Sequence, residues 1–266
     1  MLQVSLDFRE EVEEFHGLLQ TLEPGDWERA TDFKQWTPWD VVAHLHYFDL
    51  VSLVALEGEE AFAAEREAFI AAITAGRSLR EIARTRFADL DAAGLLGHWQ
   101  STAHTLADAP GQSDPKRRLP WFGPDMGVQM FMTARYMEVW AHAQEVYDLV
   151  GASRSHADRI ENIATIGMKT FGWTFANRQL PLPGPPPYVR LAAPSGEIWQ
   201  WNEPSETECI RGDAADFCQV VTQVRNIADT ALEVRGPVAT QWMSIAQCFA
   251  GVPVDPPKPG TRGPQS

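Results

Sequence analysis

The sequence predicts a mainly α-helical protein, with an N-terminal bundle of helices followed by a small α/β domain. Three observations lead to this fold class. Before residue 178, apolar residues recur every three or four positions, which is the period of an amphipathic helix. The proline-rich residues 179–188 can form neither a helix nor a central strand. After them, short runs of alternating apolar and polar residues predict strands.

The composition is that of a water-soluble globular protein. Of the 266 residues, 44% are hydrophobic and 22% are charged, which is ordinary for globular domains. We expect no transmembrane helix, since no run of about 18 apolar residues occurs. We expect no secretory signal either, because the acidic N-terminal stretch lacks a basic segment followed by an apolar one. The net charge of −14 would repel nucleic acid and anionic lipid, so neither is an expected partner.

The cysteines indicate a reduced, cytoplasmic setting. Cys209, Cys218 and Cys248 are an odd number, are widely spaced and include no CxxC pair. This pattern is not that of a disulfide framework, and it excludes a metal cluster built on thiolates. We therefore expect a cytoplasmic protein.

Apolar stripes and end signals define the helices of the first part. Thr37 can act as an N-cap, Pro38 suits the first helical position, and Asp40 completes a capping box. The helix that follows is apolar almost all round and should be buried. Between residues 78 and 107 we expect one or two helices, broken near Gly94 and Gly97. The other helices are expected at 4–22, 39–57, 59–73, 126–149 and 158–175.

The second part alternates strands and short helices. Strands are expected at 188–192, 198–201, 208–211 and 230–235, and helices at 214–224 and 239–249. The stiff proline-rich connector marks a domain boundary. The expected organisation is a helical domain over residues 1–178, a small α/β domain over 188–252, and a flexible tail rich in proline and glycine over 253–266.

Glu138 and His142 are the first candidates for metal binding. They lie four residues apart in one predicted helix, so both side chains leave the same face. A carboxylate and an imidazole at this spacing can hold one metal ion. Their apolar flanks predict burial, and a buried carboxylate needs a cation nearby. That cation is either a metal ion or Arg135, which lies on nearly the same face.

A third ligand must come from another segment, and the predicted helix over 39–57 offers two histidines. His44 and His46 are two positions apart and point roughly 200° away from each other, so one ion cannot bind both. Periodicity alone does not choose between them.

Four further residues are candidates for binding the substrate or cofactor. Arg135 could orient a substrate carboxylate, or form a plain salt bridge with Glu138. Trp121 and Phe122 are too large to leave in water without a reason. They form either the wall or lid of a pocket, or a plug that closes one end of the bundle. Trp140 is a third candidate for the pocket wall.

Two stretches resemble the DinB-like superfamily, and most closely its mycothiol-dependent maleylpyruvate isomerase type. They are WTPWDVVAHL and, much later, TARYMEVWAHAQEVYDLVG. The resemblance implies a bundle of four main helices over roughly residues 1–175. It also implies a divalent metal, usually zinc, bound by His44, Glu138 and His142, and so favours His44 over His46. The segments APSGEIWQW and IRGDAADF loosely resemble a small α/β domain of sterol-carrier-like type.

The resemblance implies a thiol cofactor such as mycothiol, whose sulfur binds the metal. Our first hypothesis is a metal-dependent isomerase or S-transferase that acts on a small electrophilic acid. The second is a hydrolase or lyase that uses the metal without a thiol. The third is a non-catalytic protein that binds metal or a small ligand, with Asp49 or His46 as a fourth ligand. The sequence identifies neither substrate nor metal, and it leaves the oligomeric state open, a homodimer included.

Overall fold

The computed structural model describes residues 1–111 and 113–265, and it confirms a mainly helical protein with a small sheet region. The chain divides into two compact units, Met1–Val150 and Gly151–Ser266. The first unit is almost entirely helical, and the second combines helices with a small sheet.

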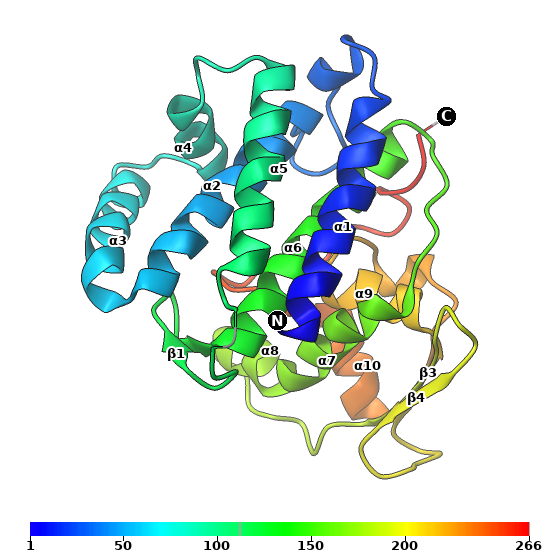
Figure 1. Ribbon diagram of the computed structural model, residues 1–266. Helices are drawn as coiled ribbons and strands as arrows, with labels where there is room; N and C mark the ends of the chain where they lie inside the picture. Colours follow the sequence, from blue (N-terminus) through cyan, green and yellow to red (C-terminus); the bar gives the residue numbers. More distant parts are fainter. Residues whose placement is uncertain (112, 266) are drawn as a thin grey trace. The chain divides into compact units, whose positions relative to one another are not determined.

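Four long helices of the first unit pack against one another in the pairs α1–α5, α1–α6, α2–α5 and α2–α6 (Figure 1). The shorter helices α3 and α4 pack on α2. A two-stranded antiparallel ribbon, β1–β2, precedes α6. The bounds are α1 Gln3–Gln20, α2 Pro38–Glu57, α3 Glu59–Thr74, α4 Leu79–Arg86, α5 Ala92–Asp108, β1 Arg118–Leu119, β2 Met126–Gly127 and α6 Val128–Leu149.

The capping box predicted for α2 is confirmed. The side chain of Thr37 accepts a hydrogen bond from the backbone N–H of Asp40, and the Asp40 carboxylate accepts one from the N–H of Thr37. Within the described residues, α2 alone is long and apolar enough to cross a membrane by length and composition. Its most apolar window is 67% buried inside the structure, as the central helix of a helical core would be.

The predicted break near Gly94 and Gly97 was wrong. Both glycines lie inside α5. The helical stretch is interrupted earlier in the chain, because α4 ends at its C-cap Phe87 and α5 begins after its N-cap Asp91. The Asp91 side chain accepts a hydrogen bond of 2.8 Å from the N–H of Gly94. This N-cap stabilises the helix start by about 1 kcal/mol, comparable to what one interior glycine costs.

The second unit contains a four-stranded sheet in the order β4-β3-β5-β6. Strand β3 pairs antiparallel with β4 and parallel with β5, and β5 pairs antiparallel with β6. Strands were predicted in all four places. The bounds are α7 Glu161–Lys169, α8 Phe171–Asn177, β3 Tyr188–Ala192, β4 Ile198–Trp201, β5 Cys209–Asp213, α9 Ala214–Val221, β6 Glu233–Arg235 and α10 Pro237–Ile245.

The division between the units falls at residue 150, before the boundary expected at 178. Residues 151–178 group with the sheet because α7 packs on α9. A Cβ added at Gly167 would lie only 3.0 Å from Val221 and 3.1 Å from Phe217. Residues 253–265, expected to be flexible, make hydrogen bonds within this unit. Val254 donates one to Gln247, and the Pro257 carbonyl accepts another.

Candidate metal centre

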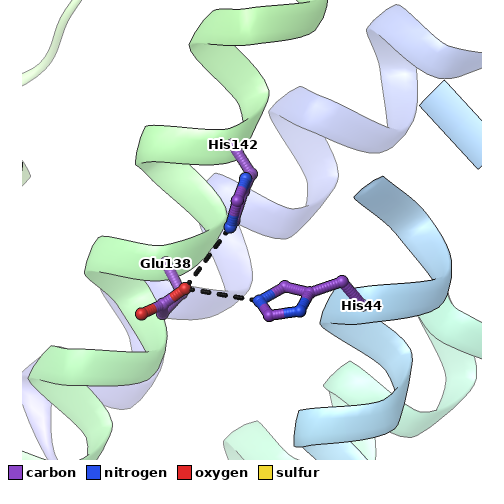
Figure 2. A group of neighbouring side chains, drawn as sticks. All are labelled: His44, Glu138 and His142. Carbon is purple, nitrogen blue, oxygen red and sulfur yellow. Dashed lines mark ion pairs between the residues drawn. The ribbon is translucent and has the colours of Figure 1, made fainter. Parts of the chain in front are cut away.

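His44, Glu138 and His142 meet at one point inside the first unit (Figure 2). Helix α2 supplies His44, and α6 supplies the other two side chains, one turn apart. The Glu138 Oε2 atom lies 3.6 Å from Nε2 of His44 and 3.5 Å from Nε2 of His142. All three donor atoms lie within 4.8 Å of one another. The two histidines are buried, while the Glu138 side chain keeps 27% of its surface exposed.

The distances from Glu138 to the two histidines are close to those between ligands of one cation. Nitrogen–oxygen separations of 3.5 and 3.6 Å are too long for good hydrogen bonds, which span about 2.7–3.2 Å. Two ligand atoms that each lie about 2.0–2.1 Å from a tetrahedral ion are about 3.3–3.4 Å apart. Two imidazole nitrogens and one carboxylate oxygen suit a first-row divalent ion and leave coordination positions open.

The three groups divide the charge of the site unequally. Burial, together with the nearby His142, lowers the pKa of His44 to about 4. Burial would also lower the pKa of His142, but the carboxylates of Glu145 and Glu138 outweigh it and raise that pKa to about 9. Burial acts to raise the pKa of Glu138, yet the two histidines hold it well below its usual range. At neutral pH the metal-free trio therefore contains an anionic Glu138, a cationic His142 and a neutral His44.

The structure places His46 away from the trio. Its ring stacks on Phe87 at 4.5 Å between centroids and lies 6.5 Å from that of His98. The two histidines of α2 thus point to different sides of the helix, as the spacing predicted. His44 alone contributes to the trio.

Arg135 pairs with Asp49 rather than with Glu138. Its Nη2 and Nε atoms lie 3.0 and 3.1 Å from Oδ1 of Asp49, and both side chains are buried. The Asp49 carboxylate also accepts a hydrogen bond of 3.1 Å from the indole of Trp99. The sequence also allowed a salt bridge between Arg135 and Glu138, but the ion pairs of the described residues do not include it. Among the described residues, neither Asp49 nor His46 belongs to this group of neighbouring donor atoms.

The aromatic walls of the site were missed by the sequence analysis. The Trp36 ring lies 5.1 Å from that of His44 and stacks nearly parallel to that of His142 at 5.7 Å. Phe33 contacts His142 edge-on at 5.2 Å, and Phe48 lies 4.8 Å from His44. The sequence signal that could have indicated these walls is the high density of aromatic residues before α2. These residues show no helical or strand periodicity, so the sequence did not indicate which way they face.

A tight loop holds two of these rings in place. The backbone carbonyl of Trp36 accepts a hydrogen bond of 2.8 Å from the N–H of Thr31, and the backbone N–H of Trp36 donates one of 2.9 Å to the carbonyl of Phe33. Between the rings, Lys34 and Gln35 adopt positive φ angles of 49° and 58°. This left-handed conformation is costly for residues other than glycine and is often found at functional sites.

The predicted wall residues lie further out. Trp121 and Phe122 contact each other and pack around Phe48, at 6.2 Å in both cases. Among the ring contacts of the described residues, Phe48 connects them to the trio through its contact with His44. Trp140, on α6, is buried. It follows Glu138 by two residues, so its side chain leaves the helix about 200° around the axis from that of Glu138 and points away from the trio.

A second carboxylate contacts the trio from behind. Oε2 of Glu145 lies 3.2 Å from Nδ1 of His142, and both side chains are buried. The two residues are three positions apart on α6, a spacing that brings side chains together. The spacing of three residues can be read from the sequence, but the sequence analysis did not identify Glu145 as a partner of His142.

Fold and site together define a helix-bundle protein that presents an open set of two histidines and one glutamate. Residues 8–147 match the family described as the mycothiol maleylpyruvate isomerase N-terminal domain, and the chain belongs to this family. It is also 34% identical over 247 residues to the uncharacterized protein Rv0036c of Mycobacterium tuberculosis strain H37Rv and to the uncharacterized protein MT0041 of strain CDC 1551. Each match covers 93% of this chain and 95% of the relative.

Two solved structures share the fold. The crystal structure of the mycothiol-dependent maleylpyruvate isomerase aligns with a TM-score of 0.53 at 14% identity, over 82% of this chain and 87% of the other. A histidine-to-alanine variant of that enzyme aligns equally well at 15% identity. At such identities the likeness shows the fold alone.

Proposed function

We propose that this protein is a metal-dependent enzyme that uses a small thiol of the mycothiol type. Its reaction would be an isomerisation of a small electrophilic acid, or a sulfur transfer to one. The observation that carries the proposal is the His44–Glu138–His142 trio, with its ion-sized spacing and open coordination positions. Membership of the family supports the thiol and the reaction class. Zinc is the first candidate for the metal because two imidazoles and a carboxylate are common ligands of catalytic zinc.

The surrounding residues would prepare the site for such chemistry. A divalent ion bound there would supply a Lewis acid and would lower the pKa of a thiol. The rings of Phe33, Trp36 and Phe48 pack against the two histidines and would shield them from water, which would strengthen electrostatic interactions. Access would be past Glu138, the most exposed member of the trio.

Arg135 has a different role in this proposal from the one that its sequence position suggested. Because it is buried in a pair with Asp49, it holds α6 against α2 beside the trio and is not free to bind a substrate carboxylate. Lys34, which is exposed and lies 4.9 Å from the centre of the Phe33 ring, offers a positive charge at the rim instead.

Metal content after purification without chelators tests the metal centre. We expect about one equivalent of zinc in the wild type, and little in His44→Ala or His142→Ala. The matched control is His46→Ala, which removes a buried histidine from the same helix without touching the trio. A wild type free of metal, or a His46→Ala variant as depleted as His44→Ala, would contradict the proposal.

Calorimetry on the zinc-loaded protein tests the thiol. Mycothiol, glutathione and bacillithiol are titrated separately, and we expect heat with mycothiol that disappears in the His142→Ala variant. Absence of heat with all three thiols would refute thiol dependence. A metal-dependent activity that persists after small thiols are removed would then indicate a hydrolase or lyase.

A further inference from the structure

Separate carboxylates face the two ring nitrogens of His142. Its Nε2 atom faces Glu138 inside the trio at 3.5 Å, and its Nδ1 atom faces Glu145 at 3.2 Å on the other side. The Glu145 side chain is only 6% exposed, so its contact with the ring is shielded from water. Nothing in the metal set itself requires this second carboxylate.

We propose that Glu145 is a positioning residue that fixes the ring and tautomer of His142 for metal binding. As acceptor, its carboxylate keeps the proton of the neutral imidazole on Nδ1, which leaves the Nε2 lone pair directed at the ion. The helical spacing of three residues sets the direction of this hydrogen bond. This inference rests on the proposed metal centre and concerns how that centre is assembled.

His44 provides an internal contrast. Its Nε2 atom also faces Glu138, but its Nδ1 atom is buried without a hydrogen-bond partner among the described residues. The two histidines are therefore held differently: a carboxylate contacts His142 from behind, whereas the ring of His44 packs against Trp36 and Phe48. Loss of Glu145 should consequently remove most of the hydrogen-bonded preorganisation of the site.

The charges support this assignment. The Glu145 carboxylate favours positive charge on His142, and it is the largest influence that raises the pKa of this imidazole. The same field makes the neutral ring a stronger electron donor toward a cation on its other nitrogen.

The test compares zinc affinities of the full-length protein by competition with a chromophoric chelator. We expect Glu145→Ala to bind zinc about 10–100-fold more weakly than the wild type, and Glu145→Gln, which keeps an acceptor oxygen, to lose less. The matched control is Asp148→Asn, a buried carboxylate on the same helix that is bonded to Gln144. Its zinc affinity should stay within about twofold of the wild type. Wild-type affinity in Glu145→Ala, or an equal loss in Asp148→Asn, would overturn the proposal.

Two spectroscopic measurements separate positioning from a general loss of structure. The visible spectrum of the cobalt-loaded protein reports the geometry around the ion, and Glu145→Ala should alter it at saturating cobalt, with circular dichroism unchanged. Proton NMR of the metal-free protein should show a low-field Nδ1–H signal of His142 that is lost in Glu145→Ala. If that signal is absent in the wild type, the positioning bond does not exist. If it is present but the wild type binds no zinc, the metal centre itself is refuted.

Discussion

Protons and metal compete for His142, the residue whose pKa is raised to about 9. Below that pH the metal-free imidazole carries a proton that zinc must displace, whereas His44, with a pKa of about 4, is already neutral. Zinc binding at pH 7 should therefore release about one proton, and affinity should rise about tenfold per pH unit up to about pH 9 and then level off. Calorimetry in buffers of different ionisation enthalpy measures the proton count. Zinc binding that releases no proton at pH 7 would contradict the charge assignment.

The buried pair of Arg135 and Asp49 should matter for stability more than any surface pair. Removing one member leaves an uncompensated buried charge, so Arg135→Met should lower the free energy of unfolding by about 3–5 kcal/mol. Adding Asp49→Leu to that variant should restore much of the loss. Urea denaturation measures the free energies of unfolding of the single and double variants. The control is Arg66→Ala, which breaks an exposed pair with Glu59 and should have a negligible effect. Equal losses in the single and double variants would argue against the pair.

For single residues, the sequence resolved spacing but not long-range partners. Helical periodicity placed Glu138 and His142 on one face, and the structure brings them together with His44. Periodicity could not separate His44 from His46, because the faces of an almost wholly apolar helix look alike. It could not find Asp49 as the partner of Arg135 either, since the two lie 86 positions apart in the chain.

Among the elements, α2 has a capped first turn that should matter for both stability and zinc binding. The capping box of Thr37 and Asp40 lies two turns before His44. Thr37→Ala should cost about 1 kcal/mol of stability and also weaken zinc binding, because the start of the helix would fray. Ser78→Ala removes the same kind of cap from α4. It should cost a similar amount while leaving zinc affinity unchanged. Thermal unfolding and chelator competition distinguish the two variants, and equal effects on zinc affinity would refute the link.

Regular elements were predictable, and irregular ones were not. Strands β3 and β4 begin and end at the predicted residues, because alternation and turn residues are local signals. The loop that carries Phe33 and Trp36 against the trio was not predictable as a wall. Its shape depends on consecutive left-handed residues that no local preference indicates.

For the whole molecule, the assignment of α7 to the second unit can be tested by dissection. The fragment 151–266 should fold by itself, whereas the fragment 179–266 should not, because it lacks the helix that covers α9. Near-ultraviolet circular dichroism and the cooperativity of unfolding measure the difference. Gly167→Leu, which forces a side chain against Val221 and Phe217, should destabilise the longer fragment by about 1–3 kcal/mol. A cooperative unfolding transition in the shorter fragment would instead favour the boundary expected at 178.

The trio draws its donors from two places far apart in the chain, α2 and α6. An ion held there would act as a reversible crosslink that closes the loop formed by residues 45–137, much as a disulfide does in secreted proteins. Free zinc at a hundred times its dissociation constant would add about 2.7 kcal/mol to the folded state. Heat resistance, and with it survival against proteases, would then follow the supply of the ion in the cell.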